Sequence, residues 1–124
     1  MSLKVLLVED DVVARGAMAK LLRHAGAMVV TASDGSEGLS RLLDDRFDVL
    51  LTDLHMPGGM DGFELIDATN RLPLAHRPRR VVAISGHFDR AVIGEMLPDS
   101  GTVDYFPKPV DLDRLIDTIG GPVN

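Results

Sequence analysis

The sequence predicts an α/β fold with a parallel sheet, because five apolar runs alternate with segments whose apolar residues repeat at helical spacing. The runs expected as strands are LKVLLV at 3–8, AMVVTA at 27–32, DVLLT at 48–52, RVVAIS at 80–85 and VDYF at 103–106. Most are continuously apolar, which is typical of strands buried on both faces. Five β-α units imply right-handed crossovers and helices on both sides of the sheet. With 124 residues and 45% hydrophobic content, one domain is expected over 1–124.

The segments between the runs carry the start and stop signals of helices. The first is followed by Gly26, a residue that favours the C-terminal end of a helix. The second and third begin at Asp34 and Asp61, each followed three residues later by a glutamate, which is typical of N-capping. A fourth helix is expected at 91–97, before a proline, and a fifth begins at Asp111. The apolar residues expected to face the core are Ala14, Met18, Leu21, Leu22, Ala25, Leu39, Leu42, Leu43, Phe63, Ile66, Leu112, Leu115, Ile116 and Ile119.

The amino-acid composition argues against several classes of function. The net charge of −6 disfavours non-specific nucleic-acid binding, and the basic cluster HRPRR at 76–80 is interpreted as a solvated loop. The chain has no cysteine, which excludes disulfides and thiolate metal sites and favours a cytoplasmic location. No apolar stretch is long enough to span a bilayer, and the N-terminus is a poor secretory signal, so no membrane insertion is expected.

Polar residues gather where the predicted strands end, which is the edge where open α/β sheets bind ligands. In chain order they are Glu9, Asp10, Asp11, Asp53, Ser85, Lys108 and Pro109. Clustered carboxylates disfavour one another's ionisation, and Mg²⁺, which prefers oxygen ligands, removes that repulsion. Mg²⁺ and a lysine together can neutralise a phosphoryl group, and a carboxylate can attack it to form an acyl phosphate. Asp53 is the best placed nucleophile because it ends a central strand.

Helix capping is the alternative explanation for acids at strand ends. Asp11 directly precedes the first helix and is expected to cap it, and Asp61 is expected to cap the third. Capping does not explain Asp53, because residues 57–59 (Pro-Gly-Gly) separate it from the next helix. Lys108 alone would be a solvated surface lysine in most proteins. The prediction of a site therefore depends on the whole set of residues.

Four stretches together resemble the receiver domains of two-component response regulators: VLLVEDD, LTDLHMPGGMDGFEL, VVAISG and DYFPKP. The resemblance covers essentially the whole chain and implies a flavodoxin-like fold, a doubly wound (βα)5 sheet with strand order 2-1-3-4-5. It implies a phosphoacceptor switch that is not an enzyme. Asp53 would accept a phosphoryl group, in a Mg²⁺-dependent reaction, from a phosphohistidine on a sensor histidine kinase or a histidine phosphotransfer protein. The sequence does not identify the downstream effector.

The resemblance also implies roles for individual residues. Mg²⁺ would be bound by Glu9, Asp10, Asp53 and the backbone carbonyl of His55. A one-residue shift of the acidic pair to Asp10 and Asp11 is the alternative. Lys108 would contact the phosphoryl group, and its peptide bond to Pro109 is expected to be cis.

A conformational switch is implied at two further positions. Once Asp53 is phosphorylated, the Ser85 hydroxyl would move toward the phosphoryl group, and Tyr105 would turn inward into the vacated space. The fourth helix, the fifth strand and the fifth helix would form the signalling face. The alternative for Tyr105 is an edge-strand aromatic residue that is packed for stability.

Two histidines lie close to the site in sequence, each two residues beyond a site residue. His55 follows Asp53, and His87 follows Ser85. We hypothesise that this pair tunes the lifetime of the acyl phosphate, with a pH dependence near neutrality. The alternative is that both are exposed loop histidines without a role.

The sequence departs from the family pattern in three places, one of them Phe106 and Pro107, which are less usual just before the lysine. MPGGMDG is one residue longer than the commoner loop, and we expect the extra glycine to be absorbed there. The region 95–102 lacks the usual alanine-rich helix end, so the fourth helix is expected to be short or mobile. Two other functions are considered: a degenerate receiver that binds partners without phosphorylation, and an aspartyl-phosphate phosphatase. The phosphatase would need an acid at the position of His55.

Overall fold

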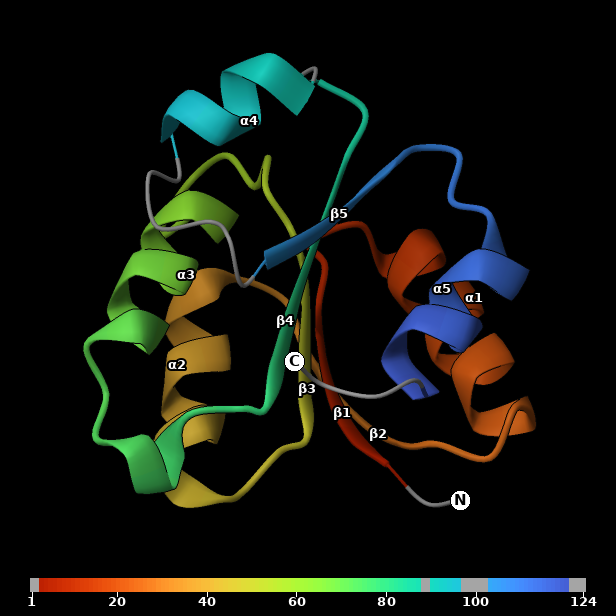
Figure 1. Cartoon of the computed structure of the whole chain (residues 1–124), viewed down its shortest axis with the longest axis horizontal. Helices are drawn as coiled ribbons and strands as arrows, with labels where there is room; N and C mark the ends of the chain where they lie inside the picture. Colours follow the sequence, from red (N-terminus) through yellow and green to blue (C-terminus); the bar gives the residue numbers. More distant parts are fainter. Residues whose placement is uncertain (1–2, 88–89, 97–102, 121–124) are drawn as a thin grey trace.

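The computed structural model describes residues 3–87, 90–96 and 103–120, and within them five parallel strands form one sheet (Figure 1). The strands are β1 (Lys4–Val8), β2 (Met28–Ala32), β3 (Val49–Asp53), β4 (Arg80–Ser85) and β5 (Val103–Pro107). Their order across the sheet is β2-β1-β3-β4-β5, and every neighbouring pair is parallel. The predicted (βα)5 flavodoxin-like fold and the strand order are confirmed.

Helices cover both faces of this sheet. They are α1 (Val12–His24), α2 (Gly35–Asp44), α3 (Gly62–Asn70), α4 (Arg90–Met96) and α5 (Leu112–Gly120), with a short 3-10 helix, η1 (Leu74–His76). In Figure 1, α1 and α5 lie on one side of the strands, and α2 and α3 lie on the other. The sequence did not predict η1, because a single 3-10 turn has no apolar periodicity.

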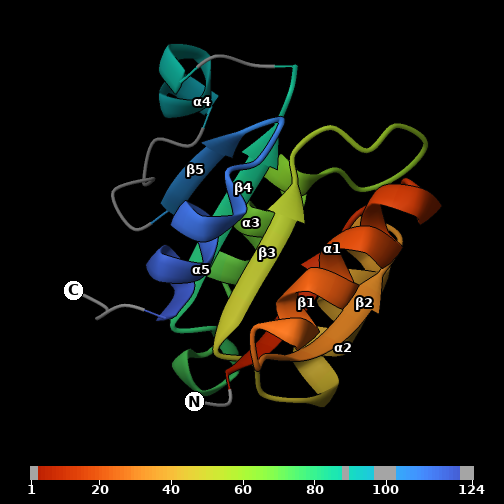
Figure 2. The ribbon, with the colours of Figure 1, turned by 90° about the vertical axis from the view of Figure 1, so that its right-hand side faces the viewer.

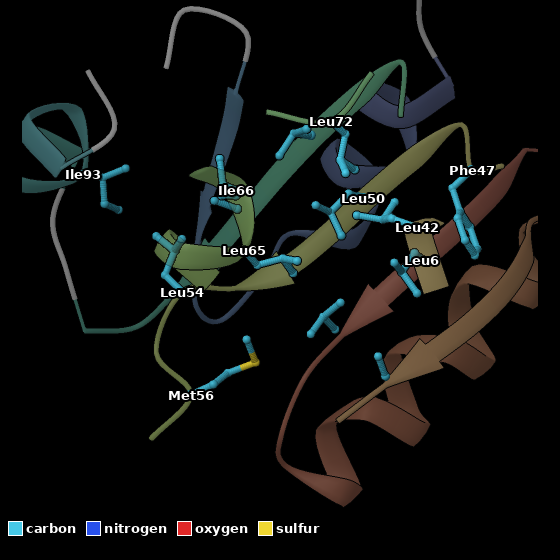
Figure 3. Close-up of a cluster of buried hydrophobic side chains, with 14 residues drawn as sticks. Leu6, Leu42, Phe47, Leu50, Leu54, Met56, Leu65, Ile66, Leu72 and Ile93 are labelled. Atoms are coloured by element: carbon cyan, nitrogen blue, oxygen red, sulfur yellow. The ribbon is translucent and has the colours of Figure 1, made fainter. Parts of the chain in front are cut away.

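The core has two layers because successive strand residues point to opposite faces of the sheet. The layer under α2 and α3 is drawn in Figure 3 and includes Leu6, Leu42, Leu50, Leu65, Ile66 and Ile93. The layer under α1 and α5 includes Val5, Leu7, Leu22, Leu51 and Leu115. The prediction that Leu21, Ala25 and Leu43 face the core is wrong, because all three lie on exposed sides of their helices or helix ends. Every residue of β3 is buried. The central strands are therefore fixed from both sides, which also fixes the backbone where they end.

Burial on both faces is confirmed for β1, β3 and β4 but is wrong for the edge strands. Met28 in β2 is 57% exposed, and no residue of β5 is fully buried. An edge strand has one unpaired side, so apolar content alone does not reveal how much of it is covered.

The capping signals mark the helix starts correctly. Asp11 accepts the Val13 N–H at 2.9 Å, Asp34 accepts the Glu37 N–H at 2.8 Å, and Asp61 forms a capping box at the start of α3. The predicted end of the fourth helix at 97, the region 97–102 and the tail 121–124 lie outside the described residues. In the part of the chain that is described, no helix is long and apolar enough to cross a membrane.

Candidate functional site

The carboxyl ends of the strands meet at one edge of the sheet, as the strand arrows in Figure 2 show. Asp53 is the last residue of β3 and is 4% exposed, and Glu9 directly follows β1 and is 2% exposed. Glu9 is tied to the neighbouring strand because its N–H donates to the Ala32 carbonyl at 3.1 Å. Two rigid strands thus bring two nearly buried carboxyl groups to the same place.

Lys108 lies between these two acids. Its Nζ is 2.7 Å from Asp53 Oδ2 and 2.9 Å from Glu9 Oε1. Lys108 follows β5, and its N–H donates to the Ser85 carbonyl at the end of β4 at 3.0 Å. The Lys108–Pro109 peptide bond is cis. One ammonium group therefore bridges carboxylates that come from two different strands.

Burial and the neighbouring charged groups shift the pKa values of Glu9 and Lys108. Burial is the main cause that raises the pKa of Glu9 to about 7; the hydrogen bond from Lys108 opposes the rise, and the charge of Asp53 adds to it. Burial by itself would lower the pKa of Lys108, but the hydrogen bonds to Asp53 and Glu9 outweigh this effect and raise it. Burial of the Glu9 carboxyl group therefore keeps it partly protonated near neutral pH, although Lys108 is hydrogen-bonded to it.

Asp10 completes a group of acids that could hold a metal ion. Carboxylate oxygens of Glu9, Asp10 and Asp53 lie within 4.8 Å of one another; Glu9 and Asp53 are buried, and Asp10 is exposed. Oxygen ligands beside a solvent-exposed opening suit Mg²⁺, which keeps several waters when it binds. A divalent cation bound here would favour the ionised form of Glu9 and so oppose the effect of burial on its pKa. The residues present therefore fit Mg²⁺, while Asp11 is engaged in capping α1.

Ser85 links the ends of β4 and β5. It is fully buried, and its Oγ accepts a hydrogen bond from the His87 N–H at 3.0 Å. Its carbonyl accepts both the Lys108 N–H and the Tyr105 hydroxyl, the latter at 3.1 Å. Tyr105 is half-buried and packs against the core layer under α2 and α3. In this structure the tyrosine ring therefore lies inward and is connected to Ser85 through that carbonyl.

His55 and His87 lie next to each other at the opening of the site. The His55 N–H donates to Asp53 Oδ1 at 3.1 Å. The ring centroids of His55 and His87 are 4.1 Å apart, with 33° between the ring planes, and both residues are exposed. The fold thus brings together two imidazoles that are 32 residues apart in the sequence (87 − 55).

Two residues that the sequence analysis did not single out also shape the site. Arg15 donates from Nη1 to the Glu9 carbonyl at 2.9 Å and so holds the turn between β1 and α1. The sequence contains only one indication of this role, namely that Arg15 lies one helical turn after the capping Asp11. Gly62 packs against the end of β3, where an added Cβ would lie 2.1 Å from the Asp53 carbonyl oxygen. A larger residue at this position would displace the backbone that carries Asp53.

The loop between β3 and α3 accommodates the additional glycine. Residues 57–59 are exposed, and Gly58 has a φ of +94°, a conformation that glycine adopts readily. Beyond the loop, Asp61 and Glu64 still form the capping box at the start of α3. The extra residue therefore leaves the next helix start intact, as the sequence predicted.

Known proteins resemble this chain in sequence and in structure. The family described as response regulator receiver domain matches residues 5–120. Protein-glutamate methylesterase/protein-glutamine glutaminase 6 of Anaeromyxobacter dehalogenans (strain 2CP-C) is 37% identical over 110 residues, covering 87% of this chain and 30% of that protein. The DNA-binding transcriptional regulator NtrC of Salmonella typhimurium is 34% identical over 114 residues, covering 90% of this chain and 23% of that protein.

The solved structure of the chemotaxis response regulator CheY4 of Vibrio cholerae is similar in fold. Its TM-score is 0.80 at 27% identity, covering 97% of this chain and 98% of that chain. In contrast, the chain spans less than a third of the two curated relatives, 30% and 23% of their lengths. Because the family match at 5–120 runs from β1 to α5, the chain belongs to the response regulator receiver domain family.

Proposed function

We propose that this chain is a phosphoacceptor switch whose Asp53 receives a phosphoryl group from a phosphohistidine on a sensor histidine kinase or a histidine phosphotransfer protein. The observation that carries the proposal is the contact of 2.7 Å between Lys108 Nζ and Asp53 Oδ2, beside the group of three acids. Membership in the receiver family supports the same role for Asp53. The proposed location of this exchange is the cytoplasm, as the sequence composition favours.

The residues around Asp53 suit phosphoryl transfer. An Asp53 oxygen attacks the phosphorus while the P–N bond to the donor imidazole breaks with its electron pair remaining on nitrogen, and an acyl phosphate forms. Lys108 Nζ donates to Asp53 Oδ2 and the His55 N–H donates to Asp53 Oδ1, and together they orient the carboxylate before the donor arrives. Glu9, Asp10, Asp53 and the His55 carbonyl would hold Mg²⁺, which supplies charge neutralisation at the transferring oxygens when it is bound.

Phosphorylation would change the hydrogen bonds of Ser85. In this structure its Oγ accepts the His87 N–H, and a phosphoryl group on Asp53 offers its hydroxyl proton a strong new acceptor. Movement of Ser85 also affects β5, because the Tyr105 hydroxyl of that strand donates a hydrogen bond to the Ser85 carbonyl. The face built by α4, β5 and α5 is the proposed signalling surface, and phosphorylation shifts it between two packings.

A groove beside the site supports a protein as the donor. A cavity of about 260 Å³ opens between α1 and the segment that follows β5. Its lining is mostly apolar and includes Met18 and Leu21 from α1, and Glu9 and Lys108 line it as well. Leu21 is 45% exposed. Apolar side chains of a helical donor could bind here while its phosphohistidine reaches Asp53.

The contact between His55 and His87 supports the hypothesis that they tune the lifetime of the acyl phosphate. Both rings are exposed beside a carboxylate that is itself nearly buried, so they can restrict the approach of water. The measurement is the decay of phosphorylated wild type against the His55→Ala/His87→Ala variant. Equal decay rates in the two proteins would show that His55 and His87 do not affect the lifetime of the acyl phosphate.

The first experiment is the intact mass of the protein after incubation with acetyl phosphate, with and without Mg²⁺. We expect a Mg²⁺-dependent gain of one phosphoryl group in wild type, no gain in Asp53→Ala, and the wild-type gain in Asp113→Ala, which removes an exposed acid of α5. No gain in wild type with small donors or with phosphorylated kinases would favour a phosphorylation-independent binding module. Release of inorganic phosphate from a phosphomonoester would favour the phosphatase instead.

The enzymatic activity in the name of one relative is not part of this proposal. The chain covers 30% of the methylesterase and matches it only over 110 residues. The receiver family and the site around Asp53 account for a signalling role without a further catalytic centre.

A further inference from the structure

The rings of His55 and His87 form an exposed aromatic surface beside the reacting carboxylate. Their centroids are 4.1 Å apart, so the two imidazoles are in contact, and they come from the loops that follow β3 and β4. The other two histidines of the chain lie elsewhere, His24 at the end of α1 and His76 in η1.

Backbone hydrogen bonds place both histidines next to the reacting groups. The His55 N–H donates to Asp53 Oδ1 at 3.1 Å, and the His87 N–H donates to Ser85 Oγ at 3.0 Å. Each bond fixes the backbone of its histidine beside the carboxylate or the hydroxyl, and the two side chains meet in the ring contact of 4.1 Å. Both imidazoles are therefore anchored at the solvent-exposed side of the site.

The leaving group of a phosphodonor must arrive on this same side. Asp53 is 4% exposed, and Lys108 occupies its Oδ2, so the phosphorus has to approach through the opening. In an in-line displacement the leaving atom lies opposite the attacking oxygen, farther toward solvent. When the donor is a phosphohistidine, the leaving group is an imidazole, a flat aromatic ring that can stack on another ring.

We propose that His55 and His87 recognise the imidazole of the phosphohistidine by stacking, which makes the site selective for a phosphoryl group carried on an aromatic ring. This inference rests on the proposed phosphoacceptor function and adds the specificity for the donor. The new P–O bond forms to Asp53, and the P–N bond breaks with its electron pair on the imidazole nitrogen. A donor ring protonated on its second nitrogen leaves as neutral imidazole, so the two histidines exchange no proton and act as positioning residues.

Two small phosphodonors separate stacking from phosphoryl transfer itself. Phosphoimidazole and phosphoramidate both react by cleavage of a P–N bond, but only phosphoimidazole carries a ring. The initial rates of phosphorylation are measured by intact mass at one pH and one Mg²⁺ concentration, and their ratio is compared between wild type and His55→Ala/His87→Ala. Stacking of two aromatic rings strengthens an interaction by about two- to tenfold. The ratio of the phosphoimidazole rate to the phosphoramidate rate should therefore fall by about that factor in His55→Ala/His87→Ala. The ratio cancels any general change in the reactivity of Asp53.

Matched variants show whether the ring surface is responsible. His55→Phe/His87→Phe keeps two aromatic rings without their nitrogens and should retain the wild-type ratio. His24→Ala/His76→Ala removes the two distant imidazoles and should also retain it. An unchanged ratio in His55→Ala/His87→Ala, or an equally low ratio in the phenylalanine variant, would overturn the stacking proposal.

The underlying function is tested separately in the same experiment. Phosphorylation of wild type by both donors, absent in Asp53→Ala, upholds the phosphoacceptor function whatever the ratio is. Failure of every donor in wild type would refute both proposals, whereas phosphorylation with an unchanged ratio refutes stacking alone.

Discussion

Replacing Glu9 by glutamine is expected to stabilise the metal-free protein and to reduce its stabilisation by Mg²⁺ strongly. Glu9 is 2% exposed, and its pKa is raised from 4.5 to about 7, mainly by burial. The folded protein therefore binds the proton of the Glu9 carboxyl group more tightly than the unfolded chain does. The stability that Glu9 contributes is complete below about pH 4.5 and is lost as the pH rises through 7.

The size of the effect follows from the rise in pKa. One pKa unit corresponds to about 1.4 kcal/mol, so the full rise would cost about 3 kcal/mol above pH 7. Water at the opening, where Asp10 is exposed, screens part of this cost, and we expect about 2 kcal/mol. Glutamine carries no charge, so Glu9→Gln should exceed the wild type by about 2 kcal/mol at pH 8 and match it near pH 4. Mg²⁺ at about 100 times its Kd should stabilise wild type by about 2.7 kcal/mol, and the variant far less.

The assay is urea denaturation between pH 4 and pH 8.5, in EDTA or in MgCl₂. Glu95→Gln is the matched control because Glu95 is exposed on α4 and should change neither the pH profile nor the Mg²⁺ effect. A metal-free wild type that is equally stable across this pH range, or a Glu9→Gln variant that is less stable than wild type at pH 8, would contradict the raised pKa of Glu9.

Three further substitutions test the packing around the site, the assignment of its acids and the helix propensity of α1. Gly62→Ala would place a Cβ 2.1 Å from the Asp53 carbonyl oxygen, so it should cost about 3 kcal/mol in urea denaturation and suppress phosphorylation. Gly59→Ala, whose Cβ would meet nothing within 4 Å, is its control, and equal losses in both would contradict the packing argument. Asp11→Ala removes the cap of α1 and should cost about 1 kcal/mol while Mg²⁺ binding in calorimetry is unchanged; weakened binding would instead support the shifted acidic pair. Gly16→Ala, at an exposed position of α1 with open space around its Cβ, should raise stability by about 0.5–1 kcal/mol, and a lower melting temperature would count against it.

The fold was predictable because its signals are local. Five apolar runs, and aspartates such as Asp34 and Asp61 before helical segments, are short-range patterns that specify each element without knowledge of its neighbours. The strand order came from the family resemblance rather than from these patterns. Exposure of Met28 was not predictable, since an edge strand and a central strand can have the same apolar content.

The candidate site was predictable in its membership but not in its contacts. Glu9, Asp53 and Lys108 could be assigned to one edge because parallel strands end together. The sequence did not give the distances of 2.7 and 2.9 Å from Lys108 Nζ to the carboxylates of Asp53 and Glu9. These contacts, and the presence of Asp10 rather than Asp11 in the acidic group, depend on the orientation of the turn after β1. That orientation is a property of packing between distant segments.

The order of the elements, the helix starts and the set of strand-end acids can be read from the amino-acid sequence, because each depends on residues within a few positions of one another. The folded structure was needed to find that Arg15 holds the Glu9 carbonyl, that Gly62 lies against Asp53, and that two histidine rings touch. These contacts join separate segments at distances of a few ångströms, and side-chain packing over such distances leaves no periodic pattern in the chain.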